Sequence, residues 1–334
     1  MGSIRERSRG EATGRSGRLP VVVASSVVRS AHKGESHGGV YLVDLETGAA
    51  EQKIDWNDRS IDWEGRGADR GLRGIAFHGD EVYLAASDEV FVYTGDFELK
   101  RVIRNRYLKH CHEICVSDGM LYLTSTGFDS VLEYDLSAGR FVRGMCVRFG
   151  RSGMISRRLG RRPLPLLRVF DPHETGGPDP ADTSHINNVS CRRGVVFVSG
   201  TKLGHLLAIE GAGIGSRAEI PYTSHNARPF GDGVLLNSTA SDRILRLDHR
   251  GDVLEAFEVP RYAEDELLFS HLPRDNARQA FGRGLCELGD GLIAGGSSPA
   301  TISVYRPGHA KPIRSVNLTM DVRNAIHGLE RWPF

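Results

Sequence analysis

The stretch HEICVSDGMLYLTST, from His112 to Thr126, recurs in outline as HNARPFGDGVLLNST, from His225 to Thr239. Each opens with a polar residue, continues as an apolar run, turns around Asp and Gly, and ends in a second apolar run. This pattern predicts two short β-strands joined by a tight turn. Four further stretches begin in the same way: RGIAFHGDEVYLAAS from Arg73, NNVSCRRGVVFVSGT from Asn187, RGLCELGDGLIAGGS from Arg283 and HGLERWPF from His327.

The spacing of these six starts indicates the fold. The first and second starts are 39 residues apart, the third and fourth 38, and the fifth and sixth 44. The two longer gaps, of 75 and 58 residues, equal one repeat plus an insertion. A period near 40 residues with four short strands per repeat is typical of a β-propeller blade. The sequence therefore predicts an all-β fold, a six-bladed β-propeller.

The two ends of the chain are expected to share the sixth blade. After the start at His327 the sequence holds a single strand pattern, whereas PVVVASSVV, GGVYLVDLETG and AEQKIDW near the N-terminus have no blade of their own. We expect these N-terminal strands to pair with the C-terminal strand and close the ring, which removes exposed sheet edges. The predicted domains are a disordered tail at residues 1–18 and a single propeller domain at residues 19–334.

Three insertions precede innermost strands, at residues 57–72, 148–184 and 262–281. Long loops in a compact domain are usually functional or disordered. Because each insertion comes just before a repeat start, we expect all three on the face where the six starts lie. They would form a lid over a central pocket.

The composition is ordinary for a soluble globular protein, with 40% hydrophobic and 25% charged residues. A net charge of +1 argues against nucleic-acid and membrane partners, and no apolar run approaches the roughly 18 residues of a membrane helix. Five cysteines without a CxxC pair predict reduced thiols rather than a disulfide framework. We therefore expect a cytoplasmic protein, and the sequence leaves a homo-oligomer open.

Histidines open alternate repeats, at His112, His225 and His327. Three neutral imidazoles around an axis suit Zn, Fe or Cu and leave a coordination position open for water or substrate. The string TSH ends at His185 and again at His225. Aligning the two strings places His185, instead of Asn187, in the ring of repeat starts, so His185 is an alternative metal ligand. The alternative is that rim histidines only bond loop carbonyls.

Two residues beside His112 are candidates for acid/base catalysis. His110 lies two positions earlier and would share a strand face with His112. Glu113 is the next residue and would orient an imidazole or act as a base. Cys111 would point away from that face, as a buried structural cysteine.

Arginine and asparagine fill the other repeat starts. Arg73 and Arg283 would bind a carboxylate or phosphate group of the substrate, since guanidinium groups bind such anions bidentately. Ion pairs with acidic residues of the insertions are an equally good interpretation. Asn187 and Asn226 would orient a substrate by hydrogen bonds, or cap loop backbone.

The phrases SHNARPFGDGVLLNSTASDRILRLD, HEICVSDGMLYLTSTGFDSVLEYD and FGRGLCELGDGLIAGGS resemble an uncharacterised bacterial family of six-bladed β-propellers, a domain of unknown function. The resemblance covers most of residues 73–330. In layout the chain is more distantly similar to strictosidine-synthase-like proteins, to gluconolactonase-like calcium hydrolases, and to the peptidyl-hydroxyglycine lyase with its three-histidine zinc. The last resemblance implies that His112, His225 and His327 hold a catalytic metal. The chain departs from the calcium hydrolases because its repeat starts are not rich in carboxylates.

These observations lead to one expected function and two alternatives. We expect a metal-dependent enzyme, a lyase, isomerase, hydrolase or oxidase, acting on a small anionic molecule at a three-histidine site on the propeller axis. Its cofactor would be one divalent transition metal, Zn, Fe or Cu. The alternatives are a non-catalytic propeller that binds a ligand or a protein, and a metal-free acid/base enzyme.

Overall fold

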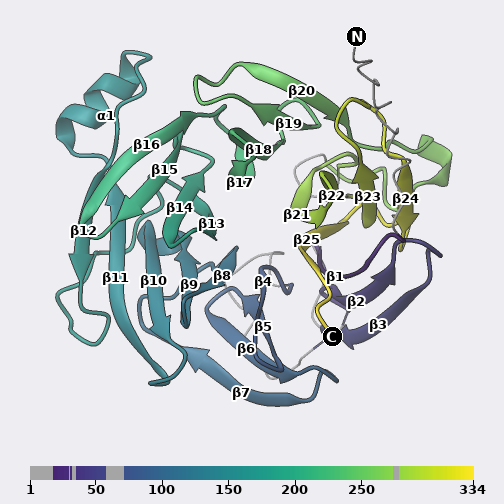
Figure 1. Ribbon diagram of the computed structural model, residues 1–334, viewed down its shortest axis with the longest axis horizontal. Coiled ribbons are helices and arrows are strands. Elements are labelled where there is room, and N and C mark those ends of the chain that lie inside the picture. The colour runs from purple at the N-terminus through teal and green to yellow at the C-terminus, as the bar shows by residue number, and fades with distance from the viewer. Residues whose placement is uncertain (1–17, 30, 32–34, 58–70, 274–277) are drawn as a thin grey trace, which may run out of the picture.

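Six antiparallel sheets form a ring around a central axis in the computed structural model, which describes residues 18–29, 31, 35–57, 71–273 and 278–334. Each sheet is one blade, and its innermost strand runs beside the axis (Figure 1). The predicted six-bladed β-propeller is therefore confirmed.

The first three blades follow each other along the chain. Blade 1 consists of β4 (Ile75–His78), β5 (Glu81–Ala86), β6 (Glu89–Thr94) and β7 (Leu99–Arg104). Blade 2 consists of β8 (Ile114–Ser117), β9 (Met120–Ser125), β10 (Ser130–Asp135), β11 (Arg140–Arg148) and a fifth strand, β12 (Leu166–Phe170). Blade 3 consists of β13 (Ile186–Arg192), β14 (Val195–Gly200), β15 (His205–Glu210) and β16 (Gly213–Glu219).

The remaining blades close the ring. Blade 4 consists of β17 (Ser224–Phe230), β18 (Gly233–Ser238), β19 (Arg243–Leu247) and β20 (Val253–Glu258). Blade 5 consists of β21 (Arg283–Gly289), β22 (Leu292–Ser297), β23 (Thr301–Tyr305) and β24 (Arg314–Asn317). Blade 6 consists of β25 (Asn324–Arg331), β1 (Val21–Val28), β2 (Gly39–Asp44) and β3 (Ala50–Asp55).

The predicted splice of the two chain ends is confirmed. β1 pairs antiparallel with β25, with Val22 opposite Arg331 and Val28 opposite Asn324. Gly328 lies where the backbone of blade 6 approaches blade 1, because a Cβ there would lie 2.1 Å from the carbonyl oxygen of Arg73. The ring therefore closes through a contact that only glycine accommodates.

Tight turns and apolar faces explain why these repeats fold as blades. In the hairpin β8–β9 the turn residues Asp118 and Gly119 both have positive φ, of 52° and 75°, as the twist-matched two-residue hairpin turn requires. Neighbouring blades pack through their apolar faces, and Val131 of blade 2 and Val189 of blade 3 belong to one buried cluster. Burial of such faces between blades stabilises the ring.

Much of the second insertion lies at the outside of the ring and not over the axis. In the second insertion, α1 (Arg151–Arg158) lies at the periphery beside β15 and β16, and β12 extends the outer edge of blade 2 by pairing with β11 (Figure 1). The reason is that Leu166–Phe170 has a strand sequence, and Phe170 packs over Gly144 of β11. Only the end of this insertion reaches the axis.

The other insertions are only partly described. Residues 58–70 of the first and 274–277 of the third lie outside the described residues. The third contains a short 3-10 helix, η2 (Glu264–Glu266), and blade 2 contains another, η1 (Thr126–Phe128). None of the helices in the described part of the chain has the length and apolar content that a bilayer crossing requires.

Candidate functional site: a histidine–arginine cluster on the axis

The innermost strands all start on one face of the ring, so the residues at their starts gather around the axis. Four imidazoles and three guanidinium groups lie close enough there to influence one another electrostatically. We call this group the His–Arg cluster, and its members are Arg29, Arg73, His112, His185, His225, Arg283 and His327.

Irregularities in the innermost strands help to aim these side chains. The pairing of β17 with β18 shifts register between His225 and Arg228, and Asn226 in that bulge has a φ of 53°. The pairing of β21 shifts beside Arg283, where Gly284 has a φ of 69°. A bulge turns successive side chains toward one side of a strand, and such bulges are common beside functional sites.

His225 carries an unsatisfied nitrogen. Its Nδ1 lies 3.2 Å from the carbonyl oxygen of Thr223, which can only accept, so Nδ1 carries the proton and Nε2 the lone pair. Nε2 is buried and has no hydrogen-bond partner among the residues that the structure describes. The residue as a whole is 5% exposed. A buried polar atom without a partner costs free energy unless a ligand satisfies it.

His112 has the same tautomer. Its Nδ1 lies 2.8 Å from the carbonyl oxygen of His110, so this nitrogen donates and Nε2 holds the lone pair. The hydroxyl of Thr126 is 2.9 Å from the same Nδ1. Both imidazoles are therefore oriented by hydrogen bonds to loop carbonyl groups, as the alternative to a metal site predicts. The Nε2 atom of each ring keeps a lone pair that can accept a hydrogen bond from a ligand.

His185 belongs to the cluster, and Asn187 has another contact. The ring of His185 lies 5.7 Å from that of His112, and its Nδ1 is 2.9 Å from the Asp182 carboxylate. The buried carboxylate of Asp129 accepts hydrogen bonds from the backbone N–H groups of residues 183–185, which fixes this approach to the axis. Asn187 donates from its side chain to the carbonyl oxygen of Ser224, tying blade 3 to blade 4.

Burial and positive charge keep the imidazoles neutral. Burial is the largest cause that lowers the pKa of His112, His225 and His327 well below the usual range. The next largest cause is an arginine in each case, Arg73 for His112 and Arg283 for the other two. Among the described residues, the strongest charge effects on these rings come from arginines and other histidines, so the cluster is electropositive.

An aromatic ring gathers the guanidinium groups. The Cζ atoms of Arg29 and Arg283 lie 4.4 Å and 4.7 Å from the centre of the Phe281 ring, within range of cation–π attraction. His225 meets the same ring edge to face at 6.2 Å. Phe281 therefore links the arginines to the imidazole with the free Nε2.

A buried polar layer lies next to the cluster along the strands. Asn226 donates to Glu113 Oε2 at 3.0 Å, and Asn237 donates to Asn226 Oδ1 at 3.1 Å. Burial raises the pKa of Glu113 to about 8, against the opposing effect of Arg228. Glu113 is therefore mostly protonated at neutral pH, and Asn226 serves this network rather than facing open space.

A third layer follows further along the innermost strands. Nη1 of Arg228 on β17 lies 3.8 Å from Oε1 of Glu330 on β25. Burial raises the pKa of Glu330 to about 7, and Arg228 opposes that rise. Three layers thus follow one another along the axis. They are the basic His–Arg cluster, the neutral polar layer around Glu113, and the Arg228–Glu330 pair of opposite charges.

His110 lies apart from the cluster. It has a left-handed backbone, with φ of 54°, and precedes β8 instead of lying in a strand. Its Nδ1 is 3.5 Å from the hydroxyl of Ser87 in blade 1. The expected shared strand face with His112 therefore does not form. Cys111 is fully buried, as expected, and all five cysteines are free thiols.

Sequence reasoning missed Arg29, Phe281 and Asn237. Arg29 follows β1, whose end lies opposite the start of β25, so the predicted ring closure is the signal that could have located it near His327. Phe281 lies two residues before Arg283, in an insertion whose course the sequence does not specify. Asn237 is the second-last residue of β18, and nothing in its strand pattern sets it apart.

The described histidines do not come together as a set of metal ligands. Among the described ranges, no group of three or more His, Cys, Asp or Glu side chains is placed to hold a metal ion. The arginines that disfavour protonation of the imidazoles also repel a divalent cation. The described residues do not fit the expected three-histidine metal site.

Comparison with known proteins supports the fold and no more. No protein-family model and no curated protein matches the chain. A protein of unknown function from Bacteroides caccae has a similar structure, with a TM-score of 0.55 and 11% identity over 93% of this chain and 98% of that one.

Two further solved structures show weaker likeness. The computationally designed Ika8 protein has a TM-score of 0.45 and 11% identity over 92% of this chain and 90% of its own. A catalytically inactive virginiamycin B lyase from Staphylococcus aureus, solved with quinupristin, has a TM-score of 0.41 and 11% identity over 75% of this chain and 74% of its own. At this level of similarity neither bears on function.

Proposed function

We propose that the protein is a metal-free enzyme that binds a small anionic substrate at the His–Arg cluster and uses His225 as a general base. The observation that carries the proposal is the buried, unpartnered Nε2 of His225 in an arginine-rich setting. A lone pair held there has no protein partner among the described residues, so substrate or water is its natural partner.

The arginines supply the affinity for an anion. Arg73 and Arg283 are among the strongest charge influences on His327, so an anion beside that ring would be attracted by both guanidinium groups. A carboxylate or phosphate in such a site forms charge-assisted hydrogen bonds, which are stronger than neutral ones. Burial strengthens these interactions by lowering the local dielectric constant.

The same anion would turn His225 into a base. The charge of Arg283 by itself opposes protonation of the ring. A bound anion offsets that charge and raises the pKa of the imidazole. Nε2 can then take a proton from a substrate carbon or hydroxyl, and the resulting imidazolium can return it to another atom of the substrate or to a leaving group. Lyase, isomerase and hydrolase reactions all use such a transfer.

Glu113 has a supporting place in this scheme. Its carboxyl group is hydrogen-bonded to Asn226, the residue after His225. A protonated carboxyl group adds no negative charge beneath the cluster, so the site stays attractive to anions at neutral pH. We assign Glu113 a positioning role through Asn226.

A metal-dependent enzyme is the second candidate. The observation in its favour is again Nε2 of His225, the atom that a transition metal would take. Because the described residues do not form a metal site, no reaction step is assigned to a metal. Elemental analysis of protein purified without added metal distinguishes the two, since about one equivalent of Zn, Fe or Cu that survives a chelator wash would favour the metal.

Calorimetric titration with malonate and with inorganic phosphate tests the proposal. Replacement of Arg283 by Gln should weaken binding of the better anion about tenfold, equivalent to about 1.4 kcal/mol. The control Arg306→Gln removes an exposed arginine in blade 5, away from the cluster, and should bind as the wild type does. Equal affinity in all three proteins, with urea unfolding unchanged, would refute anion binding at the cluster.

His225→Asn separates an enzyme from a binding protein. Anion binding should persist in this variant because the arginines remain, whereas its pH dependence should weaken. A substrate found by screening small carboxylates and phosphates should be turned over by the wild type and bound without turnover by His225→Asn. Unchanged turnover by the variant would exclude His225 as the base.

A further inference from the structure

A cavity lies between blades 3 and 4, on the face opposite the His–Arg cluster. It has a volume of about 880 Å³. The turns β13–β14 and β17–β18 line it, and these follow the innermost strands, whereas the cluster surrounds their starts. Ligand pockets typically measure about 300–1,000 Å³, so the cavity is large enough for an organic molecule.

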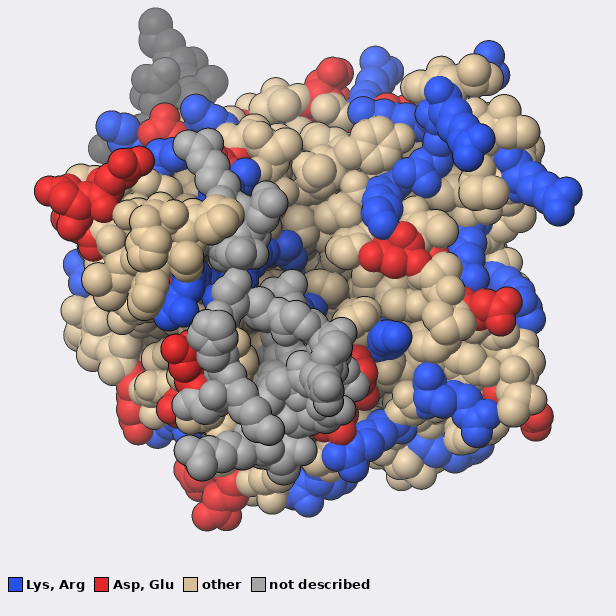
Figure 2. Space-filling model, turned by 180° about the vertical axis from the view of Figure 1, so that it is seen from behind, with Lys and Arg blue, Asp and Glu red and all other residues tan. Residues whose placement is uncertain are grey.

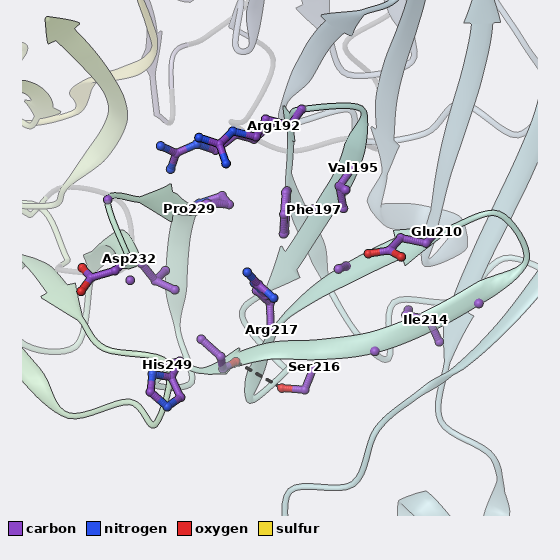
Figure 3. A pocket seen from close by; sticks show the side chains of 18 residues that line it. Arg192, Val195, Phe197, Glu210, Ile214, Ser216, Arg217, Pro229, Asp232 and His249 are labelled. Carbon is purple, nitrogen blue, oxygen red and sulfur yellow. Dashed lines mark hydrogen bonds between the residues drawn. The ribbon is translucent and has the colours of Figure 1, made fainter.

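Basic side chains converge on this cavity from two directions. Figure 3 shows Arg217 reaching from β16 into the space below Phe197, and Arg192 extending across the far side above Pro229. Arg193 lies beside Arg192 in the same turn. None of the three guanidinium groups has a hydrogen bond or ion pair with the residues that the structure describes.

The acidic residues of the cavity compensate this positive charge only in part. Glu210 and Asp232 also line it. Asp232 already faces Arg246, at 3.5 Å, so its charge is partly offset elsewhere. The three arginines therefore outnumber the two acidic groups. The imidazole of His249, at the edge of the cavity, can donate a further hydrogen bond to a ligand.

The floor of the cavity is apolar. Val195 and Phe197 of β14, Ala218 of β16 and Val234 of β18 line it. Phe197, Ala218 and Val234 are otherwise buried in the seam between the two blades. A ligand seated here would cover apolar surface with its body while its charged group met the arginines.

We infer that this cavity is a binding site for an amphiphilic organic anion, a molecule with a flat apolar body and a carboxylate, sulfonate or phosphate group. The apolar body lies on Val195 and Phe197, and the anionic group is held by Arg217 and Arg192. This site is independent of the function proposed for the axis, since no lining residue belongs to the His–Arg cluster.

Gly215 offers a way to fill the cavity without changing its charge. It lies in β16 among the lining residues, and a Cβ built on it meets no atom within 4 Å. Gly215→Phe therefore places a side chain in open cavity space and leaves the protein core intact. Arg217→Gln does the reverse, since it removes the charge and leaves a shorter polar side chain that does not fill the cavity.

Fluorescence titration with 8-anilinonaphthalene-1-sulfonate, an aryl sulfonate of this class, tests the inference on the full chain. The wild type should bind one equivalent, and Arg217→Gln and Gly215→Phe should each raise the dissociation constant about tenfold, or about 1.4 kcal/mol. Arg250→Gln, which removes an exposed arginine beside His249 but outside the lining, should bind as the wild type does.

The axial site is distinguished by Arg283→Gln, which should leave dye affinity unchanged while weakening malonate or phosphate. Circular dichroism and urea unfolding confirm that each variant is folded. The inference is overturned if the wild type shows no saturable binding, or if folded Arg217→Gln and Gly215→Phe bind the dye as tightly as Arg250→Gln.

Discussion

Replacing Glu113 by Gln should change how stability depends on pH. Burial raises the pKa of Glu113 to about 8, compared with 4.5 for an exposed glutamate. Because the folded pKa is raised, the folded protein keeps a proton that the unfolded chain has released. The contribution to stability is therefore fully present below about pH 4.5 and is lost as pH rises through about 8. Between pH 6 and pH 9 the linkage relation gives a loss of about 3 kcal/mol from this residue.

Urea unfolding at pH 6, 7, 8 and 9 measures the effect. Glu113→Gln removes the titrating group and keeps an acceptor for Asn226, so its free energy of unfolding should fall less than that of the wild type, by about 3 kcal/mol over this range. The control Glu98→Gln alters an exposed residue in blade 1 and should keep the wild-type slope. Parallel curves for the wild type and Glu113→Gln would show that Glu113 is ionised in the folded protein and would refute the reasoning.

Three further predictions follow from single contacts. Gly328→Ala should lower the free energy of unfolding by about 1–3 kcal/mol, because the added Cβ would overlap the backbone of blade 1. Gly215→Ala is the control, since its Cβ would lie in open space, and it should lower the free energy of unfolding by less or raise it. Urea unfolding measures both values. The Sγ atoms of Cys115 and Cys191 are 2.8 Å apart, so treatment with diamide should oxidise the two thiols to a disulfide that peptide mapping detects. Because the disulfide links residues 76 positions apart, it should raise the free energy of unfolding by up to about 4 kcal/mol. Failure of the native protein to form this disulfide would contradict the contact. Anion affinity at the axis should rise as pH falls, because the bound anion raises the pKa of His225 from its lowered value. The rise should reach about tenfold per pH unit if binding takes up one proton. Calorimetry in buffers of different ionisation enthalpy counts the protons taken up, and a count of zero at pH 7 would argue against the linkage.

The repeat pattern was sufficient to predict the architecture. Period and strand pattern identified six blades, and the unpaired N-terminal strands identified the closure between β1 and β25. These features depend on local alternation and on counting, which a single sequence contains. The fifth strand of blade 2 was missed because its pairing with β11 depends on contacts that bring Phe170 over Gly144.

The sequence predicted where the candidate site lies but not the chemistry of its side chains. The starts at Arg73, His112, His225, Arg283 and His327 do gather around the axis. The sequence could not show that burial and arginine charge keep the imidazoles neutral, or that no group of three ligands is placed for a metal in the described residues. Those properties depend on distances across the ring.

The layer beneath the cluster shows the same limit. Glu113 was singled out because it follows His112, whereas its carboxyl group accepts a hydrogen bond from Asn226 of blade 4, two blades further around the ring. Strand bulges set that contact, and a one-residue shift in a strand redirects every side chain after it.

A crystal structure of the protein grown with tungstate tests anion binding at the axis most directly, because the anomalous signal of tungsten locates the anion without ambiguity. The account predicts a peak within the His–Arg cluster, in contact with Arg73 or Arg283 and beside Nε2 of His225. Tungstate bound elsewhere with the cluster empty, or a transition metal held by His112 and His225 in its place, would contradict it.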